Sequence, residues 1–371
     1  MKDLSFPRPT GSAQERRAAE YVASALRGLG LEPRVDTFYA VSDMNWFPIS
    51  AGLAAFLGGV FGLFSPTAGG LVSAWAPFLL WYALTRADSP LRFLLPRVRS
   101  RNVLAVIPPR DGMKRRVVIL AHLDTNRGRL AWSAGNAAGI KWGTAGTLAA
   151  YALIPVLLLL TLITRSRWPA YGALLPCLYA LSTVGFLLFE LGNPYSPGAV
   201  DNASSVAGAL GLAEELARQP LEHTEVWLCF TGAEEVDHRG AKELLRRHPE
   251  VSGAYFLVLE GVGAGELTLV TKEGVLFPYR PDPELLKLVG MVARAHPELG
   301  IVEAPLTVVC ETQTLRRLGR KALTLAGRDP GTGTLPYWHS PDDTPDHISP
   351  KKLGATLEFL RLFLGAVDRS S

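Results

Sequence analysis

Two adjacent carboxylates at the end of an apolar run are the clearest chemical signal in the sequence. Residues 225–230 have the pattern of a buried strand, and the chain then passes through Gly232 to Glu234 and Glu235. Two like charges beside a buried strand repel each other unless a cation lies between or beside them. One carboxylate could bind a metal ion while its neighbour takes a proton from water, whereas a solvated loop is the plain structural alternative.

A histidine and two further carboxylates follow two other apolar runs. His122 and Asp124 come just after the run 116–121, and Glu260 comes directly after the run 254–259. Because the carboxyl ends of parallel strands meet at one edge of a sheet, we expect these side chains to lie close together. Asp124 is two residues from His122 and could orient a metal-bound imidazole.

Two more candidate ligands lie in segments rich in turn residues. Asp201 opens a helical stretch, so a helix cap is its plain structural explanation, and His339 lies in a loop between aromatic and acidic residues. The candidate metal ligands are His122, Asp201, Glu235, Glu260 and His339, and Glu234 remains as a candidate base. Five nitrogen and oxygen ligands suit a pair of Zn²⁺ ions with one bridging carboxylate, and the lack of a thiolate argues against an iron–sulfur site.

The segments that position these residues alternate between strand and helix. Apolar and β-branched runs predict strands, and apolar residues at helical spacing with capping signals predict helices. This alternation is typical of an α/β domain with a doubly wound, mixed, mostly parallel sheet flanked by helices. The expected strands are 34–41, 102–107, 116–121, 225–230 and 254–259, and the expected helices are 13–29, 201–218, 239–247, 283–295 and 353–367.

Long uncharged segments interrupt this pattern. Of the 371 residues 48% are hydrophobic and 19% are charged, and no charged side chain occurs in 44–85, 142–164 or 168–189. A bilayer-spanning helix needs about 20 apolar residues, and buried helices of soluble proteins rarely run so long without a charge. We therefore expect two transmembrane hairpins with four spans. The expected hairpins are 43–86 and 142–191, and the expected catalytic domain is 1–42 plus 99–141 plus 192–371.

Charge indicates the orientation and the partners. The polar segment 13–29 has no signal-peptide pattern, so we expect the N-terminus to be cytoplasmic and, with an even number of spans, the catalytic domain as well. More basic residues flank the expected spans on the side of the catalytic domain than on the opposite side, where Arg165 and Arg167 lie. The net charge is +4, but the basic residues do not form a stripe with aromatic residues among them, which argues against nucleic-acid binding. The arginines of 86–101 suit anionic lipid head groups.

Taken in order, the motifs resemble those of a known enzyme family. They are similar to the motifs of the co-catalytic di-zinc aminopeptidases of the aminopeptidase S and aminopeptidase Y type, in metallopeptidase clan MH. The resemblance covers the chain outside the hairpins, so the sequence looks like a membrane-embedded variant. The matching segments are His122-Leu-Asp124, Gly198-Ala-Val-Asp201-Asn202, Gly232-Ala-Glu234-Glu235, Leu259-Glu260 and His339-Ser-Pro-Asp-Asp-Thr-Pro.

The resemblance implies a role for each candidate residue. The implied reaction is hydrolysis of a peptide bond next to a free N-terminus, by a water that two zinc ions activate. Most relatives have aspartate where this sequence has Glu260, and the soluble relatives have a short connection in place of the second hairpin. Carried over residue by residue, Asp201 bridges the zincs, Glu235 and His339 complete one site, His122 and Glu260 complete the other, Glu234 is the general base and Asp124 orients His122.

Other functions stay open at this point. Relatives of similar fold that use one zinc catalyse glutaminyl cyclisation, and some members of the clan have lost their sites and act as receptors or scaffolds. A transporter is disfavoured because the expected spans contain no charged residue that would mark a transport path. The expected partners are a peptide with a free N-terminus, which could be membrane-associated, and the lipid bilayer.

Overall fold

The computed structural model describes residues 2–370, and the chain divides into two compact units. The first, which we call the α/β unit, comprises the residues up to Ala40, Val98–Ala137 and the residues from Pro194 onward. The second, the helical unit, comprises Val41–Arg97 and Ala138–Asn193. The helical unit is therefore made of two insertions into the sequence of the α/β unit.

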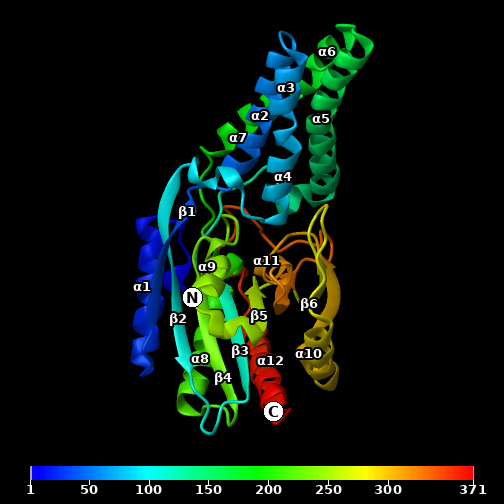
Figure 1. Cartoon of the computed structure of the whole chain (residues 1–371). Helices are drawn as coiled ribbons and strands as arrows, with labels where there is room; N and C mark the ends of the chain where they lie inside the picture. Colours follow the sequence, from blue (N-terminus) through cyan, green and yellow to red (C-terminus); the bar gives the residue numbers. More distant parts are fainter. Residues whose placement is uncertain (1, 371) are drawn as a thin grey trace. The chain divides into compact units, whose positions relative to one another are not determined.

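A single eight-stranded sheet forms the centre of the α/β unit (Figure 1). Its strand order is β1-β2-β4-β3-β5-β8-β6-β7. The run β4-β3-β5-β8 is parallel, β6 is parallel to β7, and antiparallel pairs join β2 to β4 and β6 to β8. The sheet is thus mixed and mostly parallel, as the sequence predicts. The strands are β1 (Arg34–Val41), β2 (Arg97–Ile107), β3 (Arg115–His122), β4 (Thr224–Thr231), β5 (Tyr255–Glu260), β6 (Glu266–Glu273), β7 (Val302–Leu306) and β8 (Lys321–Arg328).

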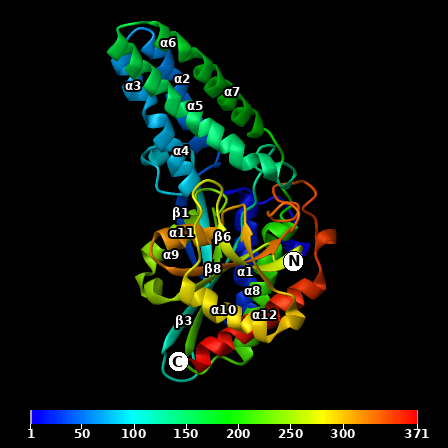
Figure 2. The same cartoon turned by 90° about the vertical axis from the view of Figure 1, so that its right-hand side faces the viewer.

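Helices cover both faces of this sheet (Figure 2). On one face α1, α8, α10 and α12 share a hydrophobic core with the strands. On the other face α11 packs against β5, β8 and α9, and the buried side chains of α9 and α11 do not join that core. The helices are α1 (Ala13–Gly28), α8 (Ser205–Arg218), α9 (Arg239–Arg247), α10 (Pro283–Ala295), α11 (Glu311–Arg317) and α12 (Pro350–Arg369).

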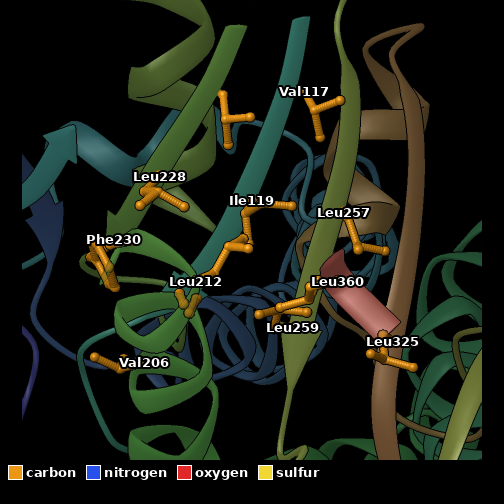
Figure 3. Close-up of a cluster of buried hydrophobic side chains, with 14 of the residues drawn as sticks. Val117, Ile119, Val206, Leu212, Leu228, Phe230, Leu257, Leu259, Leu325 and Leu360 are labelled. Atoms are coloured by element: carbon orange, nitrogen blue, oxygen red, sulfur yellow. The ribbon is translucent and has the colours of Figure 1, made fainter. Parts of the chain in front are cut away.

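The core explains why the central strands are continuous apolar runs. All six residues of β5 are buried, and so are the last six of β3. A strand covered by helices on both faces has no solvent face, so it shows no polar alternation. Figure 3 shows alternate residues of neighbouring strands, such as Ile119 and Leu257, packed with Leu212 of α8 and Leu360 of α12. This packing holds the carboxyl ends of the strands in register.

The structure adds elements that sequence patterns do not predict. Strands β6, β7 and β8 and helix α11 lie in a region where no strand or short helix was expected. In β2 the strand starts at Arg97 rather than at residue 102, because exposed arginines alternate there with inward residues such as Ser100, which is fully buried. Strand β7 is at the edge of the sheet, where Pro305 is tolerated.

The helix expected at 201–218 begins later. Regular helix starts at Ser205, and Asp201 and Asn202 have non-helical dihedral angles within a kinked turn over Ala199–Ser204. The peptide bond between Asp201 and Asn202 is cis. Both residues form hydrogen bonds with other segments of the chain.

The helical unit is held together by close approach at glycines. A Cβ atom on Gly59 would lie 2.0 Å from the sulfur of Cys177, and one on Gly62 would lie 2.4 Å from Leu158. Helix α2 therefore packs directly against α5 and α7. The helices of this unit are α2 (Trp46–Gly62), α3 (Pro66–Ser73), α4 (Trp75–Thr85), α5 (Ala137–Thr164), α6 (Trp168–Gly172) and α7 (Leu174–Glu190).

Three helical stretches are long and apolar enough to cross a bilayer, by length and composition alone. They are Pro66–Thr85, Ala134–Thr164 and Trp168–Glu190. The fourth expected span is a shorter apolar helix of 17 residues, Trp46–Gly62. The described residues thus contain three such stretches rather than the four expected.

Glu273 of β6 should make the stability of the α/β unit depend on pH. Its carboxylate accepts hydrogen bonds from Thr324 Oγ1 at 3.2 Å and from the Cys310 backbone N–H at 3.4 Å, and burial raises its pKa from 4.5 to about 8. Between these values the folded chain holds a proton that the unfolded chain has lost. The contribution of this group to stability therefore falls as pH rises from about 5 to about 8.

The variant Glu273→Gln should remove this contribution, since glutamine resembles the protonated acid. Relative to wild type, the variant should gain about 1 kcal/mol of stability per pH unit over that range. Melting temperatures of both proteins from pH 5 to pH 8 measure the difference, with the partly exposed Glu266→Gln as control. Parallel pH profiles for wild type and Glu273→Gln would show that Glu273 does not titrate there.

Candidate metal centre

The candidate site lies where the central parallel strands end. His122 is the last residue of β3 and pairs with Thr231, the last residue of β4. Glu260 is the last residue of β5, and Glu234 and Glu235 follow β4 by three and four residues. Because β4, β3 and β5 are neighbours, these side chains are brought to one edge of the sheet, where ligands of such sheets bind.

His122 lies at the centre of one group of ligand atoms. Its Nε2 is 3.0 Å from Glu260 Oε1 and 3.0 Å from Asp201 Oδ1. Its Nδ1 is 3.0 Å from the backbone carbonyl of Asp124, so the ring is fixed from the opposite side. The atoms of His122, Asp201 and Glu235 also lie within 4.8 Å of one another, as a metal site requires. All three residues are buried.

His339 lies beside Glu235 in a second group. Its Nε2 is 3.3 Å from Glu235 Oε2, and its Nδ1 is 2.9 Å from the carbonyl of Trp132. The side-chain amide of Asn126 lies between the two residues, with Nδ2 at 2.9 Å from Glu235 Oε2 and at 3.2 Å from His339 Nε2. His339 has a φ of 53°, a conformation that is strained for a non-glycine residue. The strain indicates that the loop is held in this position by its surroundings.

Asp201 is positioned through its backbone. The fully buried carboxylate of Asp343 accepts a hydrogen bond from the Val200 N–H at 2.5 Å and another from the Asp201 N–H at 3.0 Å. On the other side, Asn202 donates to the carbonyl of Leu259 at 2.9 Å, and its oxygen accepts from the Gly261 N–H. The turn that carries Asp201 is therefore tied both to the His339 loop and to the end of β5.

Glu234 is held by contacts on its backbone and on one carboxylate oxygen. Its N–H donates to Asp124 Oδ1 at 3.0 Å, and Asp124 Oδ2 accepts from the hydroxyl of Thr10 at 2.7 Å. Oε1 lies 3.4 Å from His238 Nε2, whereas Oε2 faces His122 Nε2 at 3.9 Å. The Asp124 carboxylate thus contacts the Glu234 backbone, and its Oδ1 also lies 3.8 Å from His122 Nδ1, whose hydrogen-bonding partner is the Asp124 backbone carbonyl. The role of Asp124 in orienting His122, which the sequence indicates, stays a prediction.

The turn before Glu234 requires a glycine and a buried acid. A Cβ atom on Gly232 would lie 2.4 Å from the Arg101 carbonyl and 2.7 Å from Glu15 Oε1. Glu15 accepts from Ser100 Oγ at 2.6 Å and from the backbone N–H groups of Gly11 and Ala233. Burial raises the pKa of Glu15 to about 8. This contact joins the start of α1 to the loop of the two adjacent carboxylates.

Arg8 ties the start of the chain to the candidate site. Its side chain is 1% exposed and donates to the carbonyls of Leu123 at 2.7 Å and of Pro197 and Gly198 at 3.0 Å each. Burial lowers its pKa to about 10, although neighbouring carboxylates oppose that shift. The arginine therefore stays charged and offsets part of the negative charge of the cluster.

Burial and mutual repulsion raise the pKa values of three buried carboxyl groups at the centre. Burial raises the pKa of Glu234 well above its usual value, that of Glu260 to about 8 and that of Glu311 to about 7, with nearby carboxylates adding to each effect. Burial lowers the pKa of His122, but the charges of Glu260 and Glu234 outweigh this effect and hold its pKa well above 6.5. The site thus binds positive charge in the form of protons, which a metal ion could replace.

The donor set fits a zinc ion. Three carboxylate oxygens, Asp201 Oδ1, Glu235 Oε1 and Glu260 Oε2, are buried without a hydrogen-bond partner. The separations of 3.0 and 3.3 Å between ligand atoms are close to the ~3.3 Å expected for two ligands about 2.0 Å from a tetrahedral ion. Imidazole and carboxylate ligands are both suitable for zinc. An ion would supply the attraction that these oxygens lack.

Several residues that shape the centre were not singled out from the sequence. Asn126 follows Asp124 by two residues, so its spacing from His122 could have indicated it. His238 directly precedes α9, Glu311 is the first residue of α11 and Arg129 lies in the segment after β3, and no local pattern marks them. All three side chains are buried, and only the fold brings them to the carboxyl edge of the sheet.

The contact between Asp343 and the Asp201 turn predicts a loss of metal affinity in Asp343→Ala. The variant leaves two buried N–H groups unpaired and frees the turn, so we expect zinc affinity to fall by about 10- to 100-fold. Competition with a chromophoric chelator measures this affinity. The neighbouring Asp342→Ala changes an exposed side chain of the same loop and should bind zinc as wild type does. Equal affinities in the two variants would exclude this role for Asp343.

Comparison with known proteins relates this geometry to characterised folds. The crystal structure of Tannerella forsythia glutaminyl cyclase matches with a TM-score of 0.56 and 15% identity, over 100% of this chain and 95% of that chain. The zinc aminopeptidase BSAP from Bacillus subtilis matches with a TM-score of 0.56 and 14% identity, over 98% and 92%. A Zn-dependent exopeptidase from Parabacteroides distasonis matches with a TM-score of 0.54 and 15% identity, over 97% and 92%. At these identities the matches show a shared fold.

The sequence gives a more specific relationship. No curated protein sequence matches the chain. Peptidase family M28 matches over residues 183–364, a stretch that includes Asp201, Glu234, Glu235, Glu260 and His339. This stretch of the sequence is therefore similar to peptidase family M28, and the chain has a mixed α/β fold like that of zinc exopeptidases.

Proposed function

We propose that the protein is a zinc-dependent aminopeptidase that removes N-terminal residues from peptides. The observation that carries this proposal is the position of Glu234, a buried acid with a raised pKa beside a cluster of buried ligand atoms. The match to peptidase family M28 and the structural similarity to a zinc aminopeptidase support the same function.

The residues of the centre would hold two zinc ions. His122 and Glu260 would bind one ion, Glu235 and His339 the other, and Asp201 would bridge them. The 3.0 Å contacts of His122 and the 3.3 Å contact between His339 and Glu235 support this division. When bound, zinc lowers the pKa of a nearby water and polarises the carbonyl that is attacked.

Glu234 is suited to move the proton in this reaction. His238 and the Asp124 contact hold Oε1 and the backbone, so Oε2 is the oxygen that faces the centre. Oε2 would take a proton from the attacking water and return it to the nitrogen of the departing amine. Burial raises the pKa of Glu234 well above its usual value, so its carboxylate is a stronger base than that of an exposed glutamate.

The proposed substrate is a peptide with a free N-terminus. The helical unit leaves many large apolar side chains exposed, among them Phe64 at 82% and Leu175 at 77%. A protein with such a surface is expected to stay at a bilayer. Hydrophobic or membrane-associated peptides are therefore the proposed substrate class.

Glutaminyl cyclisation is the second candidate function, because solved glutaminyl cyclases match this fold about as well as the aminopeptidases do. That reaction forms a ring from the N-terminal glutamine and releases ammonia without consuming water. We place it second because the chain presents ligands for two ions rather than one. A non-catalytic receptor or scaffold is disfavoured, since Glu234 and all five candidate ligands are present and buried.

We further propose that the helical unit spans a membrane four times and that the α/β unit is cytoplasmic. Helix α5 has Lys141 and Trp142 near its start, and Arg165 and Trp168 follow its end. The 22 residues from Trp142 to Ile163 would extend about 33 Å as a helix, close to the thickness of a hydrocarbon core. Trp and basic residues at both ends suit the two interfaces of a bilayer.

The role of Glu234 can be tested with Glu234→Gln. The variant keeps the backbone contact to Asp124 but cannot accept the proton, so turnover should fall by about 100- to 10,000-fold with zinc content unchanged. Release of p-nitroaniline from aminoacyl substrates and elemental analysis measure both quantities. The exposed Glu250→Gln is the matched control. Near-normal hydrolysis by Glu234→Gln would refute its assignment as the base, and cyclisation of glutaminyl peptides without hydrolysis would favour the second function.

The proposed topology predicts opposite labelling of two introduced cysteines. In intact cells an impermeant maleimide should label Ser166→Cys, which lies between α5 and α6, and should label Lys351→Cys on α12 only after the membrane is permeabilised. The unmodified protein is the control, because its three cysteines are buried. Labelling of both sites from the same side would contradict the proposed topology.

A further inference from the structure

The side-chain amide of Asn126 lies at one of the two expected metal positions. Asn126 is 4% exposed, and its Nδ2 contacts the ligand atoms of both residues at that position. It lies 2.9 Å from Glu235 Oε2 and 3.2 Å from His339 Nε2. An NH₂ group can only donate hydrogen bonds, so it faces two atoms that would otherwise give electron pairs to a metal.

Arg129 determines which way this amide points. Asn126 Oδ1 is 3.0 Å from Arg129 Nε and 2.7 Å from its Nη2, and it also accepts from the backbone N–H of Arg127 at 2.9 Å. A guanidinium group has no acceptor, so the amide oxygen must face it. If the amide were turned over, Oδ1 would be offered to a metal, but the NH₂ group would then face the guanidinium. The amide is therefore fixed with its donor toward Glu235 and His339.

His339 has only one electron pair to give. Its Nδ1 lies 2.9 Å from the Trp132 carbonyl, which can only accept, so Nδ1 carries the hydrogen and Nε2 carries the lone pair. The Asn126 amide lies 3.2 Å from that nitrogen. A metal ion and the amide hydrogen compete for the same lone pair, and only one of them can have it.

The other position has no such competitor among the described residues. His122 Nδ1 faces the Asp124 carbonyl at 3.0 Å, so Nε2 is again the ligand atom. Around it lie two carboxylate oxygens, Asp201 Oδ1 and Glu260 Oε1, at 3.0 Å each. An ion at this position replaces at most a proton, which zinc displaces from such ligands near neutral pH.

We infer that Asn126 makes the two metal positions unequal. The position formed by His122, Asp201 and Glu260 binds its ion tightly, and the Glu235–His339 position takes a second ion only when the Asn126 amide is displaced. The inference rests on the proposed metal-dependent function. It adds to that function a residue, Asn126, that regulates how many ions the centre holds.

Calorimetric titration of the metal-stripped, detergent-purified chain with ZnCl₂ tests this inference without measuring activity. Wild type should show one tight binding event and a second that is at least 10-fold weaker. Asn126→Ala removes the donor, and Asn126→Asp replaces it with a ligand oxygen while keeping the size and the acceptor for Arg129. Each variant should strengthen the second event at least 10-fold. Asn136→Ala, an exposed residue of the same segment, should leave both events unchanged.

The possible outcomes separate this inference from the proposed function. Two ions bound by wild type with similar affinity would overturn the inference. A difference in affinity between the two binding events that persists unchanged in both Asn126 variants would also overturn it. Either result leaves the aminopeptidase proposal intact. If the two binding events differ in affinity as expected but the protein hydrolyses no aminoacyl substrate, the inference is supported and the aminopeptidase proposal is overturned. Absence of zinc binding would overturn both.

Discussion

The arrangement of the α/β unit depends on the burial of several carboxylates in one small volume. Asp201, Glu234, Glu235 and Glu260 are each less than a tenth exposed. Removing such charges from water is unfavourable, and their mutual repulsion adds to that cost. The chain offsets it with buried cations and hydrogen-bond donors, and the remaining buried oxygens without partners are available to a bound ion. Bound protons or metal ions must therefore compensate the negative charge that is buried at the site.

The supports of the centre come from distant parts of the chain. Arg8 from the start of the chain, Asn202 from the turn before α8 and Asp343 from the His339 loop all make their contacts through backbone groups. Backbone contacts position a side chain without occupying its ligand atoms. The ligand atoms of Asp201 thus stay available, while the turn that carries this residue is fixed from two sides.

The helical unit is inserted at two places in the sequence of the α/β unit. One insertion separates β1 from β2, and the other lies between His122 and Asp201 along the chain. The strands of the α/β unit nevertheless form one hydrogen-bonded sheet, and their apolar side chains share one core. The helical unit in turn has its own buried core, which includes Tyr151, Ile154 and Leu158 of α5. Each unit therefore has the packing that its own stability requires.

Local patterns in the sequence determined the central strands, most helices and the type of chemistry. Runs such as 116–121 and 254–259 predict buried strands because strands covered on both faces need continuous apolar residues. The polar residues that follow them predict a site, because parallel strands end at one edge. Strands β6, β7 and β8 were not predicted. Polar residues interrupt the apolar ones in β6 and β7, whereas β8 is a buried, mostly apolar run like the strands that were predicted.

Only the tertiary structure decided which atoms of the candidate residues contact one another. The Asp124 carboxylate accepts from the Glu234 N–H as well as lying 3.8 Å from His122 Nδ1, and Asn126 lies between Glu235 and His339. The contacts with Glu234, Glu235 and His339 join residues that are from 109 to 213 positions apart in the chain. The sequence determined which side chains could bind a metal, because residue type sets ligand chemistry. Which atoms meet, and which donor competes with the ion, depends on packing between distant segments, which no local pattern encodes.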